Sequence, residues 1–184
     1  MAEMFIPHAE RAAMTFAQGS RRALFSRLRG DGAQLRPPWS HPEDHFIEMC
    51  SLCGDCIDAC PTNIIVAGRA GYPVLDFTRG HCTFCSSCRD ACTRDCFSRS
   101  RDHEPWQLQA RIAKNCIERS GVSCRVCQDP CEYDAIRFRP LAGGRSKPMV
   151  MSDQCTGCGA CVMCCPVRAI TIGVPETASE EMSA

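Results

Sequence analysis

Residues 50–61 read CSLCGDCIDACP, with four cysteines at the spacing C-x2-C-x2-C-x3-C and a proline directly after the last one. The same spacing returns at residues 82–92 and at residues 155–165, where Pro166 again follows the last cysteine. Residues 116–131 carry another copy whose first gap is enlarged, C-x7-C-x2-C-x3-C. The chain therefore contains one cysteine unit repeated four times, and we expect this repeat to organise the fold.

This spacing is that of a loop that binds a [4Fe–4S] cluster. Such a cluster takes one thiolate per iron, and three cysteines at two-residue gaps can surround it from a single loop. The fourth cysteine leaves the loop, and in two-cluster ferredoxins it binds the other cluster of the pair. We expect the proline after it to open a short helix, because proline is tolerated in the first helical turn. Pairing neighbouring units in this way predicts four clusters.

The crossed pairing predicts one ligand quartet per cluster. Site I is expected to use Cys50, Cys53, Cys56 and Cys92, and site II to use Cys82, Cys85, Cys88 and Cys60. Site III is expected to use Cys116, Cys124, Cys127 and Cys165, and site IV to use Cys155, Cys158, Cys161 and Cys131. Because Cys116 stands at the enlarged gap, site III is the irregular one, and without this ligand it holds a labile or incomplete cluster.

Cys96 and Cys164 fall outside the four quartets. Cys164 directly precedes Cys165, but the three-residue gap from Cys161 and the proline at position 166 favour Cys165 as the ligand. Free cysteine often behaves as a small buried hydrophobe, which is one interpretation of both extra thiols. A redox or ligand-exchange role is the other.

Eighteen cysteines in 184 residues leave two further interpretations, a disulfide framework and zinc. A disulfide framework predicts an exported protein, and we expect no signal peptide, because the apolar run after Arg22 is too short. Structural zinc usually takes pairs of C-x2-C, often with histidine, and the five histidines show no shared ligand spacing. Clusters fit the pattern best, and metal binding also supports folding where aromatic residues are only 7%.

The fold class predicted from these patterns is α+β, with two tandem bacterial-type 2[4Fe–4S] ferredoxin modules. Two pairs of apolar runs flank glycine-containing turns and predict one hairpin per module: Ile64–Val66 with Val74–Phe77, and Ala135–Phe138 with Met149–Met151. A further strand is expected at Ala169–Ile172. The predicted boundaries are a basic arm at 1–40, a first module at 41–100, a linker helix at 101–115, a second module at 116–174 and a disordered acidic tail at 175–184.

The segments outside the cysteine repeat and the overall charge limit the classes of function to consider. Arg21 and Arg22 lie in the arginine-rich arm and are candidates for docking an acidic partner, with a solvated helix face as the alternative. The 21 basic residues balance the 21 acidic ones, which argues against general nucleic-acid binding. No apolar run approaches the ~20 residues that cross a membrane. Since no phosphate loop or catalytic constellation can be argued, we expect an accessory or electron-transfer protein rather than an enzyme.

Several stretches beyond the plain cysteine pattern resemble the NapF family. They are the twin-arginine run from Ser20, the Arg-Pro-Pro-Trp-Ser stretch Arg36–Ser40, the irregular third unit ending at Cys131, and Phe138–Pro140. This family comprises ferredoxin-type accessory proteins of the periplasmic nitrate reductase system. The resemblance implies a cytoplasmic protein that binds the catalytic subunit of that reductase before its export. It also implies a role in the subunit's maturation, by inserting or reducing its [4Fe–4S] cluster.

The sequence departs from the family pattern in three places. Thr93 stands where proline usually follows a fourth cysteine, and Cys96 and Cys164 are additional. Thr93 is expected to loosen site I, and the extra thiols weaken the case for simple electron carriage. Two other functions therefore stay open, an electron-transfer polyferredoxin that serves a partner reductase and a redox-sensing regulator. A regulator needs a DNA-binding helix pair, for which the region before Cys50 gives little room.

Overall fold

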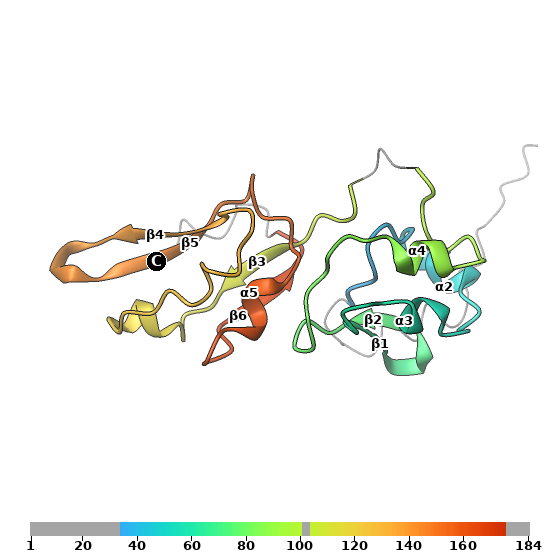
Figure 1. Cartoon of the computed structure of the whole chain (residues 1–184), viewed down its shortest axis with the longest axis horizontal. Helices are drawn as coiled ribbons and strands as arrows, with labels where there is room; N and C mark the ends of the chain where they lie inside the picture. The colour runs from blue at the N-terminus through green and yellow to red at the C-terminus, as the bar shows by residue number, and fades with distance from the viewer. Residues whose placement is uncertain (1–33, 101–103, 176–184) are drawn as a thin grey trace, which may run out of the picture. The chain divides into compact units, whose positions relative to one another are not determined.

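The computed structural model describes residues 34–100 and 104–175, which belong to one compact unit of the chain (Figure 1). We call the first range the first module and the second range the second module. The predicted docking residues Arg21 and Arg22, most of the predicted arm and the tail from residue 176 lie outside the described residues. Within the described ranges no helix has the length and apolar character that crossing a membrane requires.

The first module consists of short elements, because the stretches between its cysteines are short. They are α2 (Glu43–Met49), α3 (Asp55–Asp58), β1 (Ile65–Ala67), the 3-10 turn η1 (Arg69–Gly71), β2 (Pro73–Leu75) and α4 (Ser87–Ala91). β1 and β2 form the expected antiparallel hairpin, with Val66 opposite Val74. At its turn Gly71 takes φ 82°, which glycine adopts without steric cost.

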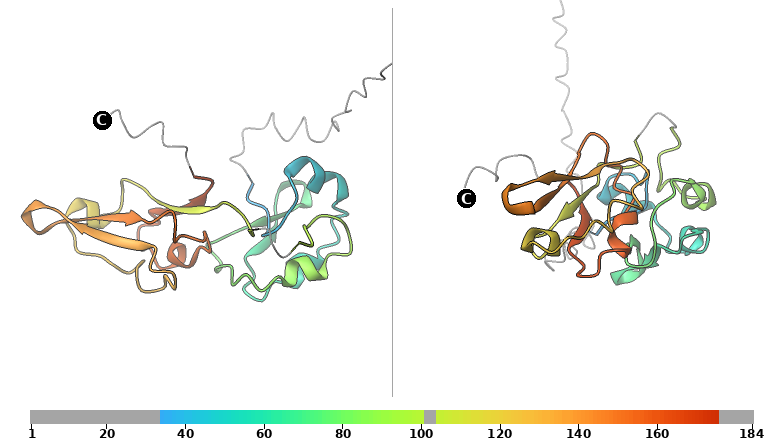
Figure 2. Two further views of the ribbon diagram at one scale, coloured as in Figure 1. Left: turned by 90° about the horizontal axis from the view of Figure 1, so that it is seen from above. Right: turned by 60° about the vertical axis from the view of Figure 1, so that its left-hand side comes forward.

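The second module contains the other predicted hairpin and one more pair of strands. Its elements are β3 (Gln109–Ile112), the 3-10 turn η2 (Ile117–Ser120), β4 (Ile136–Pro140), the 3-10 turn η3 (Ala142–Gly144), β5 (Ser146–Val150), α5 (Ala160–Met163) and β6 (Ile170–Gly173). β4 and β5 pair antiparallel, with Ile136 opposite Val150. β6 confirms the strand expected after the last cysteine unit. Figure 2 shows the β4–β5 hairpin in orange from two further directions.

The linker helix predicted at 101–115 is wrong where the structure describes it, from residue 104 onward. Gln109–Ile112 form β3, which pairs antiparallel with β6 and sets Ala110 opposite Ile172. Leu108 and Ala110 are buried, so the apolar positions alternate with the period of a strand. The edge of β6 supplies the hydrogen-bond partners, whereas an isolated helix of this length is marginal in water. The linker therefore belongs to the sheet of the second module.

The short helices precede the fourth cysteine of their units rather than follow it, which corrects the expectation drawn from the prolines. α3, α4 and α5 each contain the third cysteine and end before the fourth. The residue before each helix has a left-handed backbone, with φ 88° at Gly54, 63° at Ser86 and 86° at Gly159. This residue turns the chain from the cysteine loop into the helix. Pro61 and Pro166 lie in tight turns.

These tight turns repeat after the fourth cysteine of three units. Residues Asn63, Asp134 and Arg168 take φ 54°, 48° and 49° and follow Cys60, Cys131 and Cys165 at the same distance in sequence. Each donates its N–H to the carbonyl oxygen of that cysteine, at 3.1, 3.1 and 3.2 Å. A left-handed residue stops a helical path, so the chain leaves each fourth cysteine through a turn and enters a strand.

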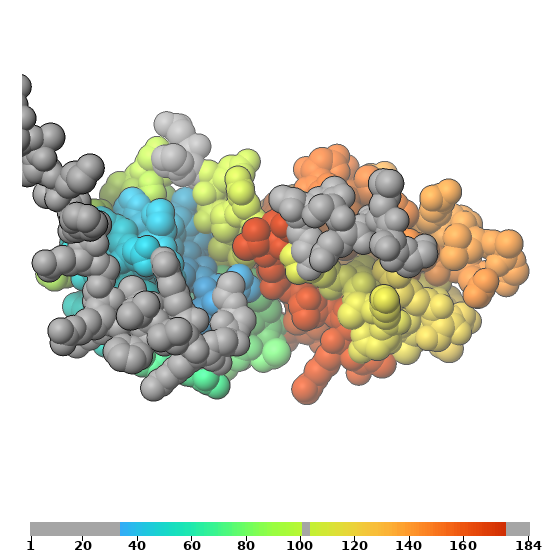
Figure 3. Space-filling model, turned by 180° about the vertical axis from the view of Figure 1, so that it is seen from behind, coloured from blue at the N-terminus to red at the C-terminus, as the bar shows by residue number. Residues whose placement is uncertain are grey.

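The two modules meet at an aromatic junction. Trp106 of the second module packs edge-on against Phe77 and Phe84 of the first, at ring-centroid distances of 6.3 and 5.4 Å. Its indole N–H donates to the carbonyl oxygen of Thr156 at 2.8 Å. A Cβ atom built on Gly159 would lie 2.1 Å from the ring of Phe77, so this glycine permits the close approach. On the face in Figure 3 the blue-to-green and yellow-to-red residues are in contact.

Candidate iron–sulfur centres

Three cavities in the described structure are each lined by one predicted quartet. The cavity at site I is lined by Cys50, Cys53, Cys56 and Cys92. The cavity at site II is lined by Cys60, Cys82, Cys85 and Cys88. The cavity at site IV is lined by Cys131, Cys155, Cys158 and Cys161. In each cavity three cysteines come from one unit and the fourth from its neighbour, which is the arrangement that the crossed pairing predicts.

Site III gathers around the buried thiol of Cys127. Burial raises the pKa of Cys127 to about 12, and the neighbouring thiols of Cys164, Cys116 and Cys124 add to this rise. The structure thus brings Cys116 to Cys124 and Cys127 despite the enlarged gap. Two cysteines of the last unit also lie here: Cys164 adds to the raised pKa of Cys127, and both Cys164 and Cys165 pack against the buried cluster that contains Cys127.

The backbone nevertheless marks Cys165 as the fourth cysteine of its unit. Its N–H bonds to Val162 at 3.3 Å, as that of Cys60 does to Ile57 at 3.2 Å, and the left-handed turn follows it. The sulfur of Cys165 accepts a hydrogen bond from the N–H of Ala169 at 3.2 Å. The thiol of Cys164 instead donates to the carbonyl oxygen of Cys161 at 3.2 Å.

Backbone N–H groups point at sulfur in three of the four sites. Phe84 donates to the sulfur of Cys82, and Ala110 donates to that of Cys155, both at 3.4 Å. The bond from Ala169 to Cys165 described above is the third. Such bonds stabilise negative charge on sulfur and raise the reduction potential of a cluster. They suit thiolates that carry a cluster and have no role for an inert thiol in a core.

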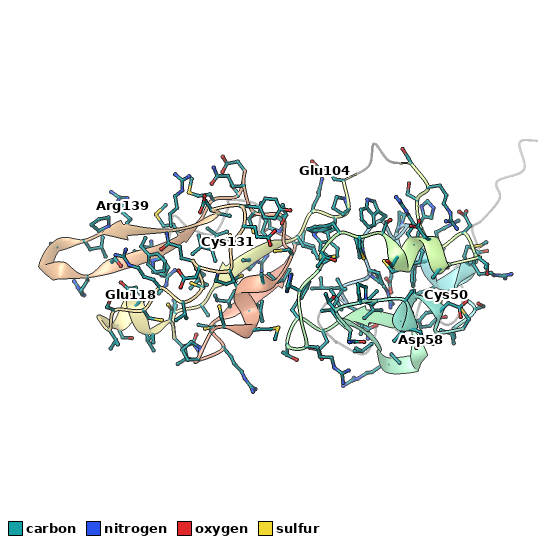
Figure 4. All side chains as sticks on the ribbon, in the orientation of Figure 1. Cys50, Asp58, Glu104, Glu118, Cys131 and Arg139 are labelled. Carbon is teal, nitrogen blue, oxygen red and sulfur yellow. The ribbon has the colours of Figure 1, made fainter. Side chains whose placement is uncertain are left out.

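The third cysteine of each unit is buried among other thiols. The pKa values of Cys56, Cys88, Cys127 and Cys161 each rise to about 12, first because of burial and next because of neighbouring cysteines. Four thiolates cannot share such a space without positive charge, and bound iron supplies it. The donor sets therefore fit [4Fe–4S] clusters, which take four thiolates each. Figure 4 shows Cys50 at the end of α2 and Cys131 in the second module.

Cysteines of neighbouring sites also lie close enough to affect each other. Cys56 of site I contributes to the raised pKa of Cys88 at site II, after burial and Cys82. Cys158 of site IV contributes likewise at Cys82 of site II, and the N–H of Cys82 donates to the carbonyl oxygen of Cys158 at 2.8 Å. In the second module Cys127 of site III acts on Cys161 of site IV. The sites therefore follow one another in the order I, II, IV, III.

Glu118 supports site III and was not identified from the sequence. It lies in η2, inside the enlarged gap, and is 5% exposed (Figure 4). Its carboxylate accepts hydrogen bonds from the hydroxyl of Ser146 on β5 and from the N–H of Cys124. These two bonds, together with the charge of Arg125, lower the pKa of the Glu118 carboxyl. A glutamate in a cysteine loop gives no sequence signal of burial, because glutamate is normally exposed.

Both spare thiols lie beside a cluster site. Cys96 is 2% exposed and lines the site I cavity, where it contacts the thiols of Cys92 and Cys50. Cys164 lies beside site III, as described above. The expectation that they are small buried residues fits Cys96 in burial, but neither thiol packs far from the predicted ligands. Sites II and IV, which contact each other, are lined in the described structure by their own quartets.

Two regions of the sequence, residues 46–93 and residues 121–169, each match a family described as a 4Fe-4S dicluster domain. The first match covers both cysteine units of the first module. The second match begins after Cys116 and covers the cysteines from Cys124 to Cys165. The chain is therefore a tandem dicluster protein of the ferredoxin type, and [4Fe–4S] clusters are its cofactors. The predicted fold class is confirmed.

Similarity over most of the chain then defines the family. Ferredoxin-type protein NapF of Escherichia coli K12 is 44% identical over 153 residues, 83% of this chain and 93% of that protein. NapF of Haemophilus influenzae is 48% identical over 138 residues, 75% of this chain and 78% of that protein. The ferredoxin-type protein MauM of Methylorubrum extorquens is 29% identical over 166 residues, 81% and 76% of the two chains. This chain belongs to the NapF family of ferredoxin-type proteins.

Proposed function

We propose that this protein is an accessory factor of a periplasmic nitrate reductase system. It acts in the cytoplasm, where it binds the catalytic subunit before export and assists its maturation by inserting or reducing a [4Fe–4S] cluster. The observation that carries the proposal is the 44% identity to NapF over 83% of the chain. That identity reaches well beyond the cysteine spacing, which unrelated ferredoxin-type proteins share.

The ligand sets in this proposal are the four crossed quartets. The cavities at sites I, II and IV support three of them directly, because each is lined by one quartet. At site III the repeated backbone turn and the N–H bond to sulfur favour Cys165 over Cys164. Cys116 completes this quartet, because Glu118 holds the loop that separates it from Cys124.

The first module offers a surface through which a partner reaches the clusters. Cys53 and Cys85 are exposed, whereas Cys56 and Cys88 of the same units are buried. Leu52, next to Cys53, is 45% exposed and gives this edge an apolar contact. A bound cluster supplies one-electron chemistry or the cluster itself. The chain's own residues shield one side of each site and leave the other side accessible to an apoprotein.

An anaerobic capture experiment tests the proposal. Tagged protein is co-expressed with the reductase catalytic subunit, and the captured proteins are identified by mass spectrometry. We expect the subunit to be recovered in its cluster-free, unexported form. Recovery of a membrane quinol oxidase in its place contradicts the maturation role and favours electron transfer.

Charge reversal locates the docking residues in the same experiment. Exchanging Arg21 and Arg22 for glutamate weakens capture if the arm docks the partner, because the arm then repels acidic groups. The matched control reverses the charge of Arg139 and Lys147, which are exposed and lie opposite each other on the β4–β5 hairpin. Equal capture by all three proteins removes the arm from the interface and leaves the remainder of the proposal standing.

The junction of the modules favours a second function, electron transfer through all four sites. The hydrogen bond from Cys82 to Cys158, at 2.8 Å, joins the loops of sites II and IV directly. The order I, II, IV, III then gives one continuous route between the two outer sites. Such a route serves a polyferredoxin that receives an electron at one end and delivers it at the other.

Variants of Trp106 test this route. Trp106→Ala removes the ring between Phe77 and Phe84 and the bond to Thr156, whereas Trp106→Phe keeps an aromatic contact and loses the bond. In the fully reduced protein, electron paramagnetic resonance reports magnetic coupling between neighbouring clusters. We expect broadened signals that sharpen most in Trp106→Ala, at unchanged iron content. Identical spectra in all three proteins contradict a route through the junction.

A further inference from the structure

A cluster of two histidines and one aspartate lies outside the four cysteine sites. His41 Nε2 is 3.6 Å from one carboxylate oxygen of Asp95, and His45 Nε2 is 3.3 Å from the other. The three potential ligand atoms all lie within 4.8 Å of one another. Ligand atoms that share one transition-metal ion at bond lengths of about 2.0–2.2 Å lie at most about 4.4 Å apart, so the two histidine–aspartate separations fit one ion and the cluster contracts slightly when the ion binds. We propose that His41, His45 and Asp95 bind one divalent transition-metal ion.

The backbone holds these residues in position before any metal binds. The N–H of His41 donates to the carbonyl oxygen of Cys96 at 3.0 Å, and the N–H of Ser98 donates to that of Trp39 at 2.8 Å. These bonds flank an antiparallel bridge between Ser40 and Phe97. The segment that carries His41 is thereby fixed against the segment that carries Asp95. The backbone of the site is thus preorganised, whereas the ring of His45 gives up a contact of 3.1 Å between its Nε2 and the carbonyl oxygen of Asp95 when the ion binds.

Helix α2 brings the second histidine to the same point. His45 follows His41 by four residues, which is about one helical turn. The N–H of Phe46 bonds to the carbonyl oxygen of Pro42 at 2.9 Å, so the helical turn is already closed between the two histidines. Phe46 is 1% exposed and packs edge-on against Phe97 at 5.8 Å. This packing fixes α2 on the segment next to Asp95.

The donor set indicates the class of metal. Two imidazoles and one carboxylate suit borderline ions such as Zn²⁺, and they leave at least one coordination position open. The side chains of His41, His45 and Asp95 are 30, 42 and 61% exposed. Water or a ligand from a partner protein can therefore complete the coordination. A bound ion would also tie the segment before α2 to the segment between Cys92 and Cys96, two residues that line site I.

The histidine pair and the aspartate were not predicted as metal ligands from the sequence, for two different reasons. The spacing of the two histidines can be read from the sequence, so the expectation of no shared ligand spacing overlooked it. Asp95 lies 50 residues after His45, and the strand-like pairing that unites them gives no local signal. In the sequence, His41-Pro-Glu-Asp-His45 therefore resembles an ordinary helix start.

Zinc binding to the cluster-loaded protein tests the site. The protein, purified anaerobically with its iron and sulfide intact, is dialysed against Zn²⁺, and its metal content and zinc-edge X-ray absorption are measured. We expect about one Zn²⁺ per chain with nitrogen and oxygen neighbours at about 2.0–2.1 Å. Zinc that has displaced iron shows sulfur neighbours at about 2.3 Å instead. A sulfur shell, or no bound zinc at full iron content, overturns the proposal.

Substitutions locate the ion. The double variant His41→Gln with His45→Gln should lose at least tenfold in zinc affinity, and the single variant His45→Gln should lose affinity to a smaller extent. Glu48→Gln is the matched control, because Glu48 is an exposed residue of the same helix. Iron and sulfide content shows that each variant is folded, and His45→Gln serves if the double variant loses iron. Zinc affinity equal to that of the control in the folded variants overturns the assignment.

Discussion

The two modules support their outer cluster sites in different ways. Beside site I the support lies outside the cysteine motif, where the guanidinium of Arg36 donates to both carboxylate oxygens of Glu43 and to the carbonyl oxygen of Pro73. At site III the support lies inside the motif, where Glu118 joins the enlarged gap to Ser146 of β5. The enlarged gap between Cys116 and Cys124 is therefore compatible with an ordered cluster site, because the inserted residues form the turn η2.

The inner and outer sites differ as well. Sites II and IV contact each other through the bond between Cys82 and Cys158, and Cys96 and Cys164 lie beside sites I and III. The two extra thiols therefore lie beside sites I and III, which are the first and last in the order I, II, IV, III. Each outer site therefore has a spare thiol beside it, whereas the inner pair is joined by a backbone hydrogen bond.

The largest effect is expected from the fourth ligand of site III. Cys165→Ala should remove that cluster and lower the iron content by about four per chain, because one iron loses its thiolate. Cys164→Ala is the matched control and should keep all the iron. Iron and sulfide determination on anaerobically purified protein distinguishes the two. The reverse result would make Cys164 the ligand. It would also contradict the inference that the left-handed turn after Cys165 marks a fourth ligand.

The next effect concerns the internal support of the same site. Glu118→Ala leaves the N–H of Cys124 and the hydroxyl of Ser146 without their acceptor, so the loop should open and site III should fill only in part. Glu132→Ala, at an exposed position, is the control. Iron content and resonance spectra check the result. Full occupancy of site III in Glu118→Ala would show that the cluster alone orders the enlarged gap.

A moderate effect is expected from the external support of the first module. The side chain of Arg36 is 9% exposed and lies over the rings of Phe46 and Tyr72 at 5.2 and 5.5 Å. Arg36→Met keeps much of the packing but loses the charged hydrogen bonds, which should lower the free energy of unfolding by about 2 kcal/mol. Thermal unfolding followed by cluster absorbance measures this, with the exposed Lys147→Met as the control. Equal transitions would mean that the bonds add no stability.

The smallest effect is expected from the spare thiol of site I. Cys96 contacts the thiols of Cys92 and Cys50, and a hydrogen bond to ligand sulfur stabilises the reduced cluster. Cys96→Ala should therefore lower the potential of site I by an amount on the order of tens of millivolts, at unchanged iron content. Redox titration followed by resonance spectroscopy measures the shift. Loss of iron from Cys96→Ala would instead make this thiol a ligand.

The local features of the fold could be predicted because they depend on short stretches. Both hairpins and the strand β6 follow from apolar runs and glycine turns. The four crossed quartets stay a prediction from cysteine spacing, with which the cysteines that line sites I, II and IV agree. β3 could not be predicted, since its hydrogen bonds come from β6, which lies far along the chain. Glu118 was missed for the same reason, because its partner Ser146 belongs to another element.

The departure at Thr93 shows a similar limit. The sequence predicts that loss of the proline loosens site I, but it cannot show what takes its place. In the structure the guanidinium of Arg99 donates to the carbonyl oxygen of Cys92 at 2.6 Å and to that of Arg89 at 3.2 Å. An arginine with five donors can satisfy two carbonyl groups at once. The carbonyl of the fourth cysteine of unit two is therefore held by a side chain seven residues further along the chain.

The number of clusters per chain decides whether each of the four quartets holds a [4Fe–4S] cluster. Iron, zinc and acid-labile sulfide are measured on the anaerobically purified full-length protein, and Mössbauer spectra identify the cluster type. We predict about sixteen iron and about sixteen sulfide per chain, all in four-iron clusters. About twelve iron and about twelve sulfide would mean that site III holds no cluster. Stoichiometric zinc without sulfide would contradict the account as a whole.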